Sequence, residues 1–340
     1  MIKILYGIQG TGNGHISRAL VIIPLLKKLG MVDVLLSGTQ SELKIPFDIK
    51  YLCKGLSIVA NKNGGINLLE TYKKSSLKQL YADIKKIPVA DYDLVISDFE
   101  PVTAWACKLH KKACIGLSHQ AAVMHKNAPK PKYKDLIGTL ILNQYAPVTM
   151  TYGFHFQNYA NNIHTPVISN AILECTPTND GTVVVYLPAY DAQNIIKVLK
   201  LIKQTKWVVF TKNCTKKYTE ANLEINPIST LKFIQALINC DGVLTGAGFE
   251  TPAEVLYLKK KLMVIPMKGQ FEQQCNAVCL NKLGVPVLKK LNKKQLPKIE
   301  AWLNTAQHIK VDYPNDIENI LSTIVKKHSN AKPLIVAQNV

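Results

Sequence analysis

Residues 3–29 read KILYGIQ GTGNGH ISRALVIIPLLKKL. The first seven form an apolar run of strand length, and residues 16–29 repeat apolar side chains with helical spacing until Gly30. A turn with three glycines separates the two segments, and residues 32–36 are strand-like again. This order of strand, helix and strand predicts a βαβ unit, from which parallel sheets covered by helices are built.

The same alternation continues on both sides of one irregular segment. Residues 152–180 are polar, contain two prolines and several asparagines and show no period, which is typical of a linker between domains. The other strand-like runs lie at 93–97, 113–117, 182–187, 207–211, 242–244 and 261–265. The helical patterns lie at 68–87, 102–110, 192–204, 230–239, 251–257 and 317–328.

We therefore predict an α/β protein of two Rossmann-like domains that face a central cleft. The N-terminal domain spans residues 1–160, and residues 161–180 form the linker. The C-terminal domain spans residues 181–328, and we expect its last helix to pack back on the N-terminal domain. Residues 329–340 form a tail without readable structure.

The composition excludes several classes of protein. With 47% hydrophobic residues among 340, each half can bury a core, so the chain is neither disordered nor fibrous. No stretch approaches the about 18 uninterrupted apolar residues that span a membrane, and the first residues do not have the pattern of a signal peptide. The eight cysteines show no CxxC spacing, which favours buried, reduced thiols over a metal site. We expect a cytoplasmic protein.

The formal net charge of +19 comes almost entirely from lysine, because Arg18 is the only arginine. Such a charge attracts anionic partners of many kinds. The lysine pairs are dispersed, with no aromatic stacking surface between them, so we expect no nucleic-acid partner. The lysines at 126–134 and the segment 56–87 are candidates for peripheral contact with the inner face of the plasma membrane.

The glycine-rich turn after the first strand is the first candidate site. Its glycines let a ligand approach the backbone closely, and the following helix start supplies free N–H donors. The spacing matches neither the G-x-G-x-x-G fingerprint nor the P-loop, which argues against NAD and ATP. The turn consists of Gly10, Thr11, Gly12, Asn13, Gly14 and His15.

Three polar side chains associated with this turn each have a functional and a structural interpretation. His15 can deprotonate a hydroxyl as general base, or it can cap the helix. Arg18 can hold a phosphate oxygen with its planar fork, or it can form a salt bridge. Asp98, at the end of a strand, can orient His15, or it can be an ordinary strand-end aspartate.

A second strand-to-helix turn, GAGFETPAE at residues 246–254, is the other candidate site. The N–H groups of its helix start and the Thr251 hydroxyl can bind a diphosphate. One turn further on, Glu254 can accept hydrogen bonds from both hydroxyls of a ribose. After the next strand, residues 266–277 (PMKGQFEQQCNA) provide amides suited to sugar hydroxyls.

Together the two motifs resemble those of the GT-B glycosyltransferases, most of all the bacterial N-acetylglucosaminyltransferase of lipid-linked peptidoglycan precursors and its relatives. The similarity runs from the first strand to about residue 290. It implies that the first domain binds an acceptor, which is a sugar, a lipid or a small molecule, and that the second binds a UDP-sugar. It also implies inverting transfer of a hexose or N-acetylhexosamine without a metal or another cofactor.

The resemblance assigns a role to each matching residue. His15 is the general base, with Asp98 as its partner, and Glu254 binds the ribose. The diphosphate, base and sugar of the donor fall to Phe233, Gly246, Gly248, Phe249, Thr251, Gln270, Gln273 and Gln274. On the acceptor side, the turn from Gly10 to Gly14 and Arg18 are joined by His119 and Gln120, which match the peptidoglycan enzyme's motif only in part.

One departure from the family leaves alternatives open. Gly246 stands where relatives carry a phosphate-binding histidine or arginine, so the diphosphate must rely on backbone groups, Thr251 or a lysine. A UDP-sugar hydrolase or epimerase would use the same two turns. A protein that binds a nucleotide sugar without turnover is the alternative from a different class.

Overall fold

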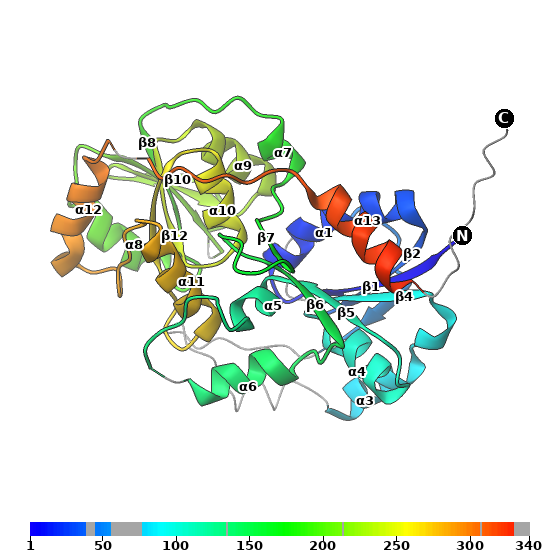
Figure 1. Cartoon of the computed structure of the whole chain (residues 1–340). Coiled ribbons are helices and arrows are strands. Elements are labelled where there is room, and N and C mark those ends of the chain that lie inside the picture. The colour runs from blue at the N-terminus through cyan, green and yellow to red at the C-terminus, as the bar shows by residue number, and fades with distance from the viewer. Residues whose placement is uncertain (39–44, 56–76, 134, 213, 307, 330–340) are drawn as a thin grey trace, which may run out of the picture.

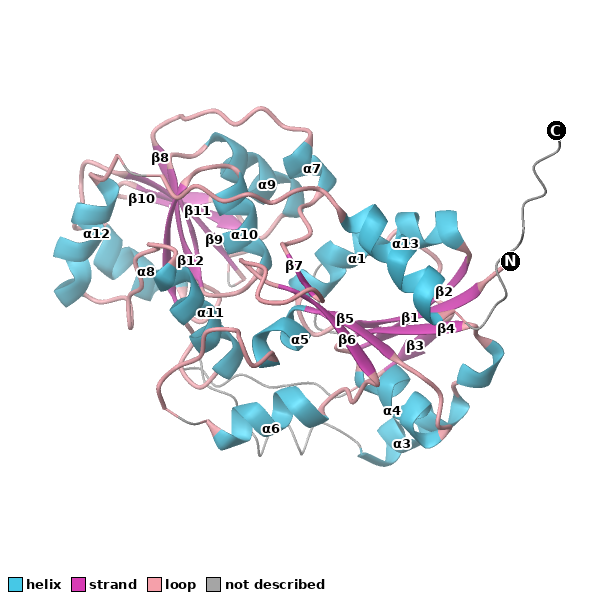
Figure 2. Cartoon of the chain, in the orientation of Figure 1, coloured by secondary structure: helices cyan, strands magenta, loops and turns pink. Residues whose placement is uncertain are grey.

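The computed structural model describes residues 1–340 except 39–44, 56–76, 134, 213, 307 and 330–340. The described chain forms two sheets, each with helices on both faces, that lie beside each other (Figures 1 and 2). This confirms the predicted α/β fold of two Rossmann-like halves.

The first sheet has seven strands in the order β3-β2-β1-β4-β5-β6-β7, and all its pairs are parallel. The strands are β1 (Lys3–Gln9), β2 (Met31–Ser37), β3 (Tyr51–Cys53), β4 (Leu94–Asp98), β5 (Ile115–Ser118), β6 (Met150–Phe154) and β7 (Ile163–His164). The helices of this half are α1 (Asn13–Leu29), α3 (Leu77–Lys86), α4 (Pro101–Leu109), α5 (His119–Met124) and α6 (Leu136–Gln144), with a 3-10 turn at Val89–Asp91.

The second sheet has six strands in the order β10-β11-β9-β8-β12-β13, of which only the β10–β11 pair is antiparallel. The strands are β8 (Thr182–Tyr186), β9 (Lys206–Thr211), β10 (Tyr218–Glu220), β11 (Leu223–Pro227), β12 (Gly242–Gly246) and β13 (Lys261–Ile265). The helices are α8 (Ala192–Leu199), α9 (Thr230–Asn239), α10 (Glu250–Tyr257), α11 (Phe271–Lys282), α12 (Leu296–Leu303) and α13 (Ile317–His328), with a 3-10 turn at Lys293–Gln295.

The segment between the sheets differs from a plain linker. β7 lies beyond the expected boundary at residue 160 and extends the first sheet, because it pairs with β6. The short helix α7 (Asn170–Leu173) follows it. These elements are too short to show a period in the sequence, which is why residues 161–180 look irregular.

The last helix returns to the first half (Figure 1). α13 lies against α1, where Lys28 Nζ is 3.1 Å from Glu318 Oε1. Its end is held by the Tyr152 hydroxyl, 2.8 Å from His328 Nε2. The chain therefore crosses between the halves twice.

The strand orders determine where a ligand can bind. In the first sheet the order reverses between β1 and β4, and in the second between β8 and β12. In open α/β sheets ligands bind at such reversals, outside the carboxyl ends of the strands. The turn at residues 10–15 follows β1, Asp98 ends β4, and the turn at residues 246–249 follows β12.

Candidate active site

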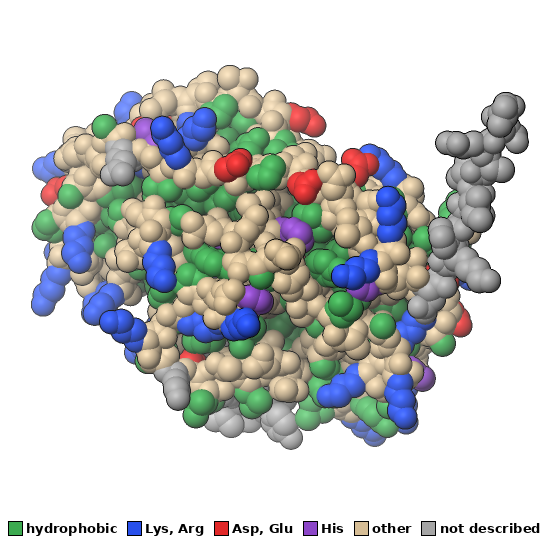
Figure 3. All heavy atoms as spheres, viewed as in Figure 1, with side chains coloured by type: hydrophobic (Ala, Val, Ile, Leu, Met, Phe, Trp, Pro, Cys, Tyr) green, Lys and Arg blue, Asp and Glu red, His purple; other side chains and the backbone are tan. Residues whose placement is uncertain are grey.

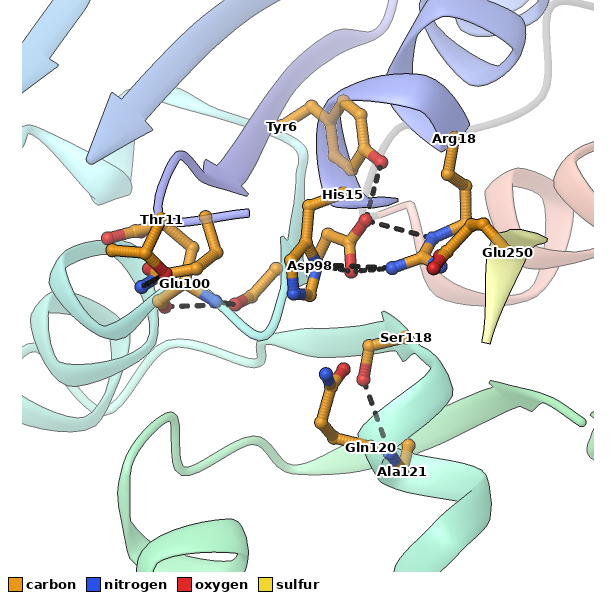
Figure 4. Close-up of polar contacts among 12 residues, drawn as sticks. Tyr6, Thr11, His15, Arg18, Asp98, Glu100, Ser118, Gln120, Ala121 and Glu250 are labelled. Atoms are coloured by element: carbon orange, nitrogen blue, oxygen red, sulfur yellow. Dashed lines mark hydrogen bonds and ion pairs between the residues drawn. The ribbon is translucent and has the colours of Figure 1, made fainter. Parts of the chain in front are cut away.

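His15 and Asp98 form a hydrogen-bonded pair at the end of the first sheet (Figure 4). His15 lies in the first turn of α1, and its Nδ1 is 2.9 Å from Oδ1 of Asp98. Arg18 Nη2, which only donates, also lies 3.1 Å from this Nδ1, so the donor and acceptor roles of Nδ1 depend on the tautomer. In the tautomer with the proton on Nδ1, His15 donates to Asp98 and Nε2 presents its lone pair. Because no other described residue hydrogen-bonds Nε2, this nitrogen is available to a substrate proton.

Arg18 holds this pair in place from the next turn of α1. Its Nε lies 3.0 Å from Oδ2 of Asp98, and its Nη2 lies 2.6 Å from Oδ1. Burial alone would raise the pKa of Asp98, but the charge of Arg18 and hydrogen bonds from His15 and Arg18 outweigh burial and lower that pKa. The carboxylate therefore stays ionised, as a partner of a charged imidazolium must.

The third nitrogen of the same guanidinium crosses to the second half. Arg18 Nη1 forms an ion pair with Oε1 of Glu250, the first residue of α10 (Figure 4). The carboxylate of Glu250 also fills the space beside Gly14, where a Cβ would overlap it. The first candidate turn and the start of α10 are therefore in direct contact.

A second set of contacts joins the halves nearby. The ring of His119, at the start of α5, stacks on Phe249 with centroids 3.9 Å apart, and its Nε2 lies 2.8 Å from Oδ1 of Asn276. Gln120 Nε2 donates to Oε2 of Glu272 over 2.9 Å. α5 and α11 thus meet across the interface (Figure 1).

Glu254, on α10, is a buried carboxyl without a cationic partner among the described residues. Its Oε1 accepts a hydrogen bond of 2.7 Å from the Ser169 hydroxyl. Burial, assisted by the nearby Glu250 charge and opposed by Ser169, raises the pKa of Glu254 to about 7. A carboxyl with a pKa raised to near neutrality by burial is a frequent feature of binding and catalytic sites.

Two cavities flank these contacts. One of about 910 Å³ lies in the first half and is lined in part by Ser97, Phe99, Ser118 and Gln120. Phe99 follows Asp98 with φ of 54°, which is an unusual conformation for an aromatic residue and typical of strained positions at functional sites. Gln120 Oε1 is buried without a hydrogen-bond partner among the described residues. This cavity therefore offers an unused acceptor to a ligand hydroxyl.

The second cavity, of about 1000 Å³, lies at the carboxyl ends of β8, β12 and β13. Gly246, Met267 and Gln274 line it, together with Lys132 and Tyr133 from the first half. It therefore lies at the strand-order reversal of the second sheet, beside the second candidate turn.

Comparison with known proteins identifies the family. The family model described as glycosyl transferase family 1 matches residues 2–305. The chain belongs to this glycosyltransferase family. A search of curated proteins finds no match to this glycosyltransferase.

Solved structures with the same fold are GT-B glycosyltransferases, which confirms the fold class. UGT89C1 of Arabidopsis thaliana complexed with UDP is 14% identical, with a TM-score of 0.55 over 96% of this chain and 94% of that one. SnogD from Streptomyces nogalater is also 14% identical, with a TM-score of 0.55 over 96% of each chain. MurG of Acinetobacter baumannii is 14% identical, with a TM-score of 0.54 over 96% of this glycosyltransferase and all of MurG.

Several residues singled out in the sequence do lie together at this interface. The turn at residues 10–14, His15 and Asp98 lie opposite the start of α10, where Thr251 is half-buried. A Cβ built on Gly248 would meet no atom within 4 Å, so open space borders the turn.

Other candidates lie elsewhere or are already occupied. The guanidinium of Arg18 binds two carboxylates, and so it is not the free phosphate ligand that its position suggests. The Phe233 ring packs against Tyr186 and Phe210, both with centroids 5.2 Å away, so only the backbone of Phe233 remains a candidate contact for the nucleotide base. His119 is buried between the halves, where it contacts Asn276 rather than open space.

The glutamines of residues 266–277 mainly make hydrogen bonds within their own loop. Gln273 Oε1 accepts from the Met267 N–H over 3.0 Å, and Gln274 Nε2 donates to the Met267 carbonyl over 2.9 Å. Gln270 Oε1 is buried without a partner among the described residues. Of the three, Gln270 therefore has the buried acceptor without a partner among the described residues, while Gln274 borders the second cavity.

Sequence reasoning missed three residues that shape the site. Glu250 and Glu272 lie within the two quoted motifs, and each crosses the interface to a residue of the first half. The signal that could have identified Glu250 and Glu272 is that each is a charged residue among small or amide residues. Ser169 gave no signal, because its contact with Glu254 depends on the path of the segment between the domains.

Proposed function

We propose that this glycosyltransferase moves a hexose or N-acetylhexosamine from a UDP-sugar to an acceptor hydroxyl, without a metal and with His15 as general base. The observation that carries the proposal is the His15–Asp98 pair, with Nε2 unengaged, directly opposite the start of α10. A base and a leaving-group site on facing sides of a cleft are what displacement at a sugar carbon requires.

In the proposed reaction the acceptor oxygen forms a bond to the anomeric carbon as the bond from that carbon to the diphosphate breaks. The acceptor proton passes to Nε2 of His15, and Asp98 stabilises the imidazolium that results. Attack in line with the departing UDP inverts the configuration at the sugar. The N–H groups at the start of α10 and the Thr251 hydroxyl stabilise the charge on the diphosphate.

The donor half of the proposal rests on α10 and its surroundings. Glu254 would accept hydrogen bonds from the ribose hydroxyls in place of the one from Ser169. UGT89C1 has been solved with UDP and, at 13% identity, with UDP-L-rhamnose, which supports a UDP-sugar here. The acceptor, a sugar, a lipid or a small molecule, would enter the cavity lined by Phe99 and Gln120.

Calorimetric titration with UDP, GDP, TDP and NAD, each without added metal, tests the donor site. We expect UDP to bind selectively and the variant Glu254→Ala to lose that binding. His15→Ala should retain UDP affinity while transfer falls by about 10²–10⁴-fold. If no nucleotide binds to the wild-type protein, the proposal is wrong, and release of free sugar without an acceptor would instead identify a hydrolase.

We propose in addition that the protein contacts an anionic membrane surface through α6. Among the described residues no helix is long and apolar enough to cross a membrane. α6 buries none of its residues, and Leu136, Ile137 and Leu140, here called the α6 apolar face, are 57–76% exposed. The exposed lysines at 126 and 132 precede α6, whereas Lys134 and residues 56–76 lie outside the described residues. On the face shown in Figure 3, Lys and Arg side chains are more frequent than Asp and Glu side chains. An apolar face flanked by lysines is typical of peripheral binding to anionic lipid.

A further inference from the structure

Glu250 places a negative charge at the position where the proposed function needs to bind two phosphates. It is the first residue of α10 and is adjacent in sequence to Thr251, the proposed diphosphate ligand. The start of a helix attracts anions through its N–H groups and dipole. A carboxylate at the helix start repels a second anion and so weakens the attraction of the helix start for phosphate.

Arg18 does not neutralise the Glu250 charge completely, because its single positive charge is shared between two carboxylates. One guanidinium contacts both Asp98 and Glu250, so the three groups carry a net charge of −1. The side chains of Arg18 and Asp98 are 1% and 0% exposed, whereas that of Glu250 is 23% exposed. The excess negative charge therefore lies on the exposed member of the group, Glu250.

Packing fixes Glu250 in this position. Arg18 holds one carboxylate oxygen, and the other lies against Gly14, where no side chain fits. The carboxylate cannot turn toward the first half any further to make room for a ligand. Charge and position are both built into the interface.

We propose that Glu250 lowers the affinity of the site for the diphosphate and so speeds the release of UDP after transfer. This inference rests on the proposed UDP-sugar site. Release of product limits the turnover of many enzymes, so a carboxylate that weakens product binding raises turnover although it adds no contact to the substrate.

Stopped-flow measurement of UDP dissociation, with calorimetry for affinity, tests the proposal without knowledge of the acceptor. Glu250→Gln keeps the length of the side chain and a hydrogen-bond acceptor for Arg18 but removes the charge. We expect UDP to dissociate about 3- to 10-fold more slowly from this variant and to bind more tightly by the same factor. A residue with only a structural role would not give tighter binding when it is replaced.

Two further variants isolate the local charge. Glu250→Asp keeps the charge, so UDP should dissociate from it as from the wild type. Glu318→Gln removes the same charge from the exposed pair with Lys28 and should leave UDP dissociation unchanged. The inference is wrong if Glu250→Gln releases UDP as fast as the wild type, or if Glu250→Asp behaves like Glu250→Gln. Absence of UDP binding in the wild type would instead refute the proposed function.

Discussion

Replacing Glu254 by glutamine should stabilise the protein at alkaline pH and weaken its binding of UDP. Burial raises the pKa of this carboxyl from 4.5 to about 7, and the hydrogen bonds from Ser169 oppose that rise. A shift of about 2.5 units corresponds to about 3 kcal/mol between the two protonation states. Glutamine preserves the shape and can still accept from Ser169, but it never ionises.

The direction in which stability changes with pH follows from proton binding in the folded and unfolded states. Between pH 4.5 and about 7 the unfolded chain has lost the Glu254 proton while the folded protein keeps it. Stability from this group is therefore fully present below pH 4.5, falls as the pH rises through this window and is constant above it. Glu254→Gln removes the loss, so the variant should match the wild type at pH 4.5 and exceed it by up to about 3 kcal/mol at pH 8.

Denaturant unfolding of both proteins at pH 5 and pH 8 measures this difference, and UDP titration at the same pH values measures its functional counterpart. The wild type should bind UDP more weakly by up to about tenfold for each pH unit below 7, because the ionised carboxylate is the better acceptor for ribose hydroxyls. The affinity of Glu254→Gln should be lower and should change less with pH than that of the wild type, because only the titration of Glu254 has been removed. A glutamine variant less stable than the wild type at pH 8 would refute the reasoning, because Glu254 would then be a satisfied core residue.

Three further predictions concern the interface and the surface. Asp98→Asn should reduce transfer by about 10²–10⁴-fold and stability by about 1–3 kcal/mol, because Arg18 loses charge-assisted hydrogen bonds while Glu250 still balances its charge. Activity and unfolding assays check this, and unchanged transfer would contradict it. Phe249→Ala should cost about 3–5 kcal/mol in denaturation, because the ring that stacks on His119 is lost from a buried position. Serine at all three positions of the α6 apolar face should leave unfolding almost unchanged yet reduce sedimentation with phosphatidylglycerol vesicles, and equal sedimentation would exclude this surface.

The two glycine-rich turns, at residues 10–15 and 246–249, were predictable because each is part of a local sequence pattern. A strand, a glycine-rich turn and a helix follow one another within about 25 residues, so β1 and α1, like β12 and α10, could be assigned from periodicity alone. The antiparallel strand β10 and the two-residue strand β7 were missed, because three residues or fewer carry no period.

Contacts between distant residues could be anticipated only where sheet rules constrain them. β4 pairs with β1 so that Asp98 lies beside Ile8, and this brings Asp98 to His15, 83 residues away. A carboxylate at the end of a neighbouring parallel strand is a reasonable expectation. The contact of Arg18 with Glu250, 232 residues apart, depends on how the two halves are oriented, which no local pattern encodes.

Under the proposed function, the two glutamates of α10 would link donor binding to the His15–Asp98 pair. Residues four apart share one helix face, and two negative charges there repel each other. The structure limits this repulsion by pairing Glu250 with Arg18 of the first half and by keeping Glu254 protonated up to a pKa of about 7, under the Ser169 hydroxyl. If a ribose replaces Ser169 as the partner of Glu254 and Glu254 ionises, its charge repels that of Glu250. The ion pair of Glu250 with Arg18 then contributes more to stabilising the Glu250 charge. Under the proposed function, donor binding at Glu254 would then act through Glu250 and Arg18 on Asp98, the carboxylate that hydrogen-bonds His15.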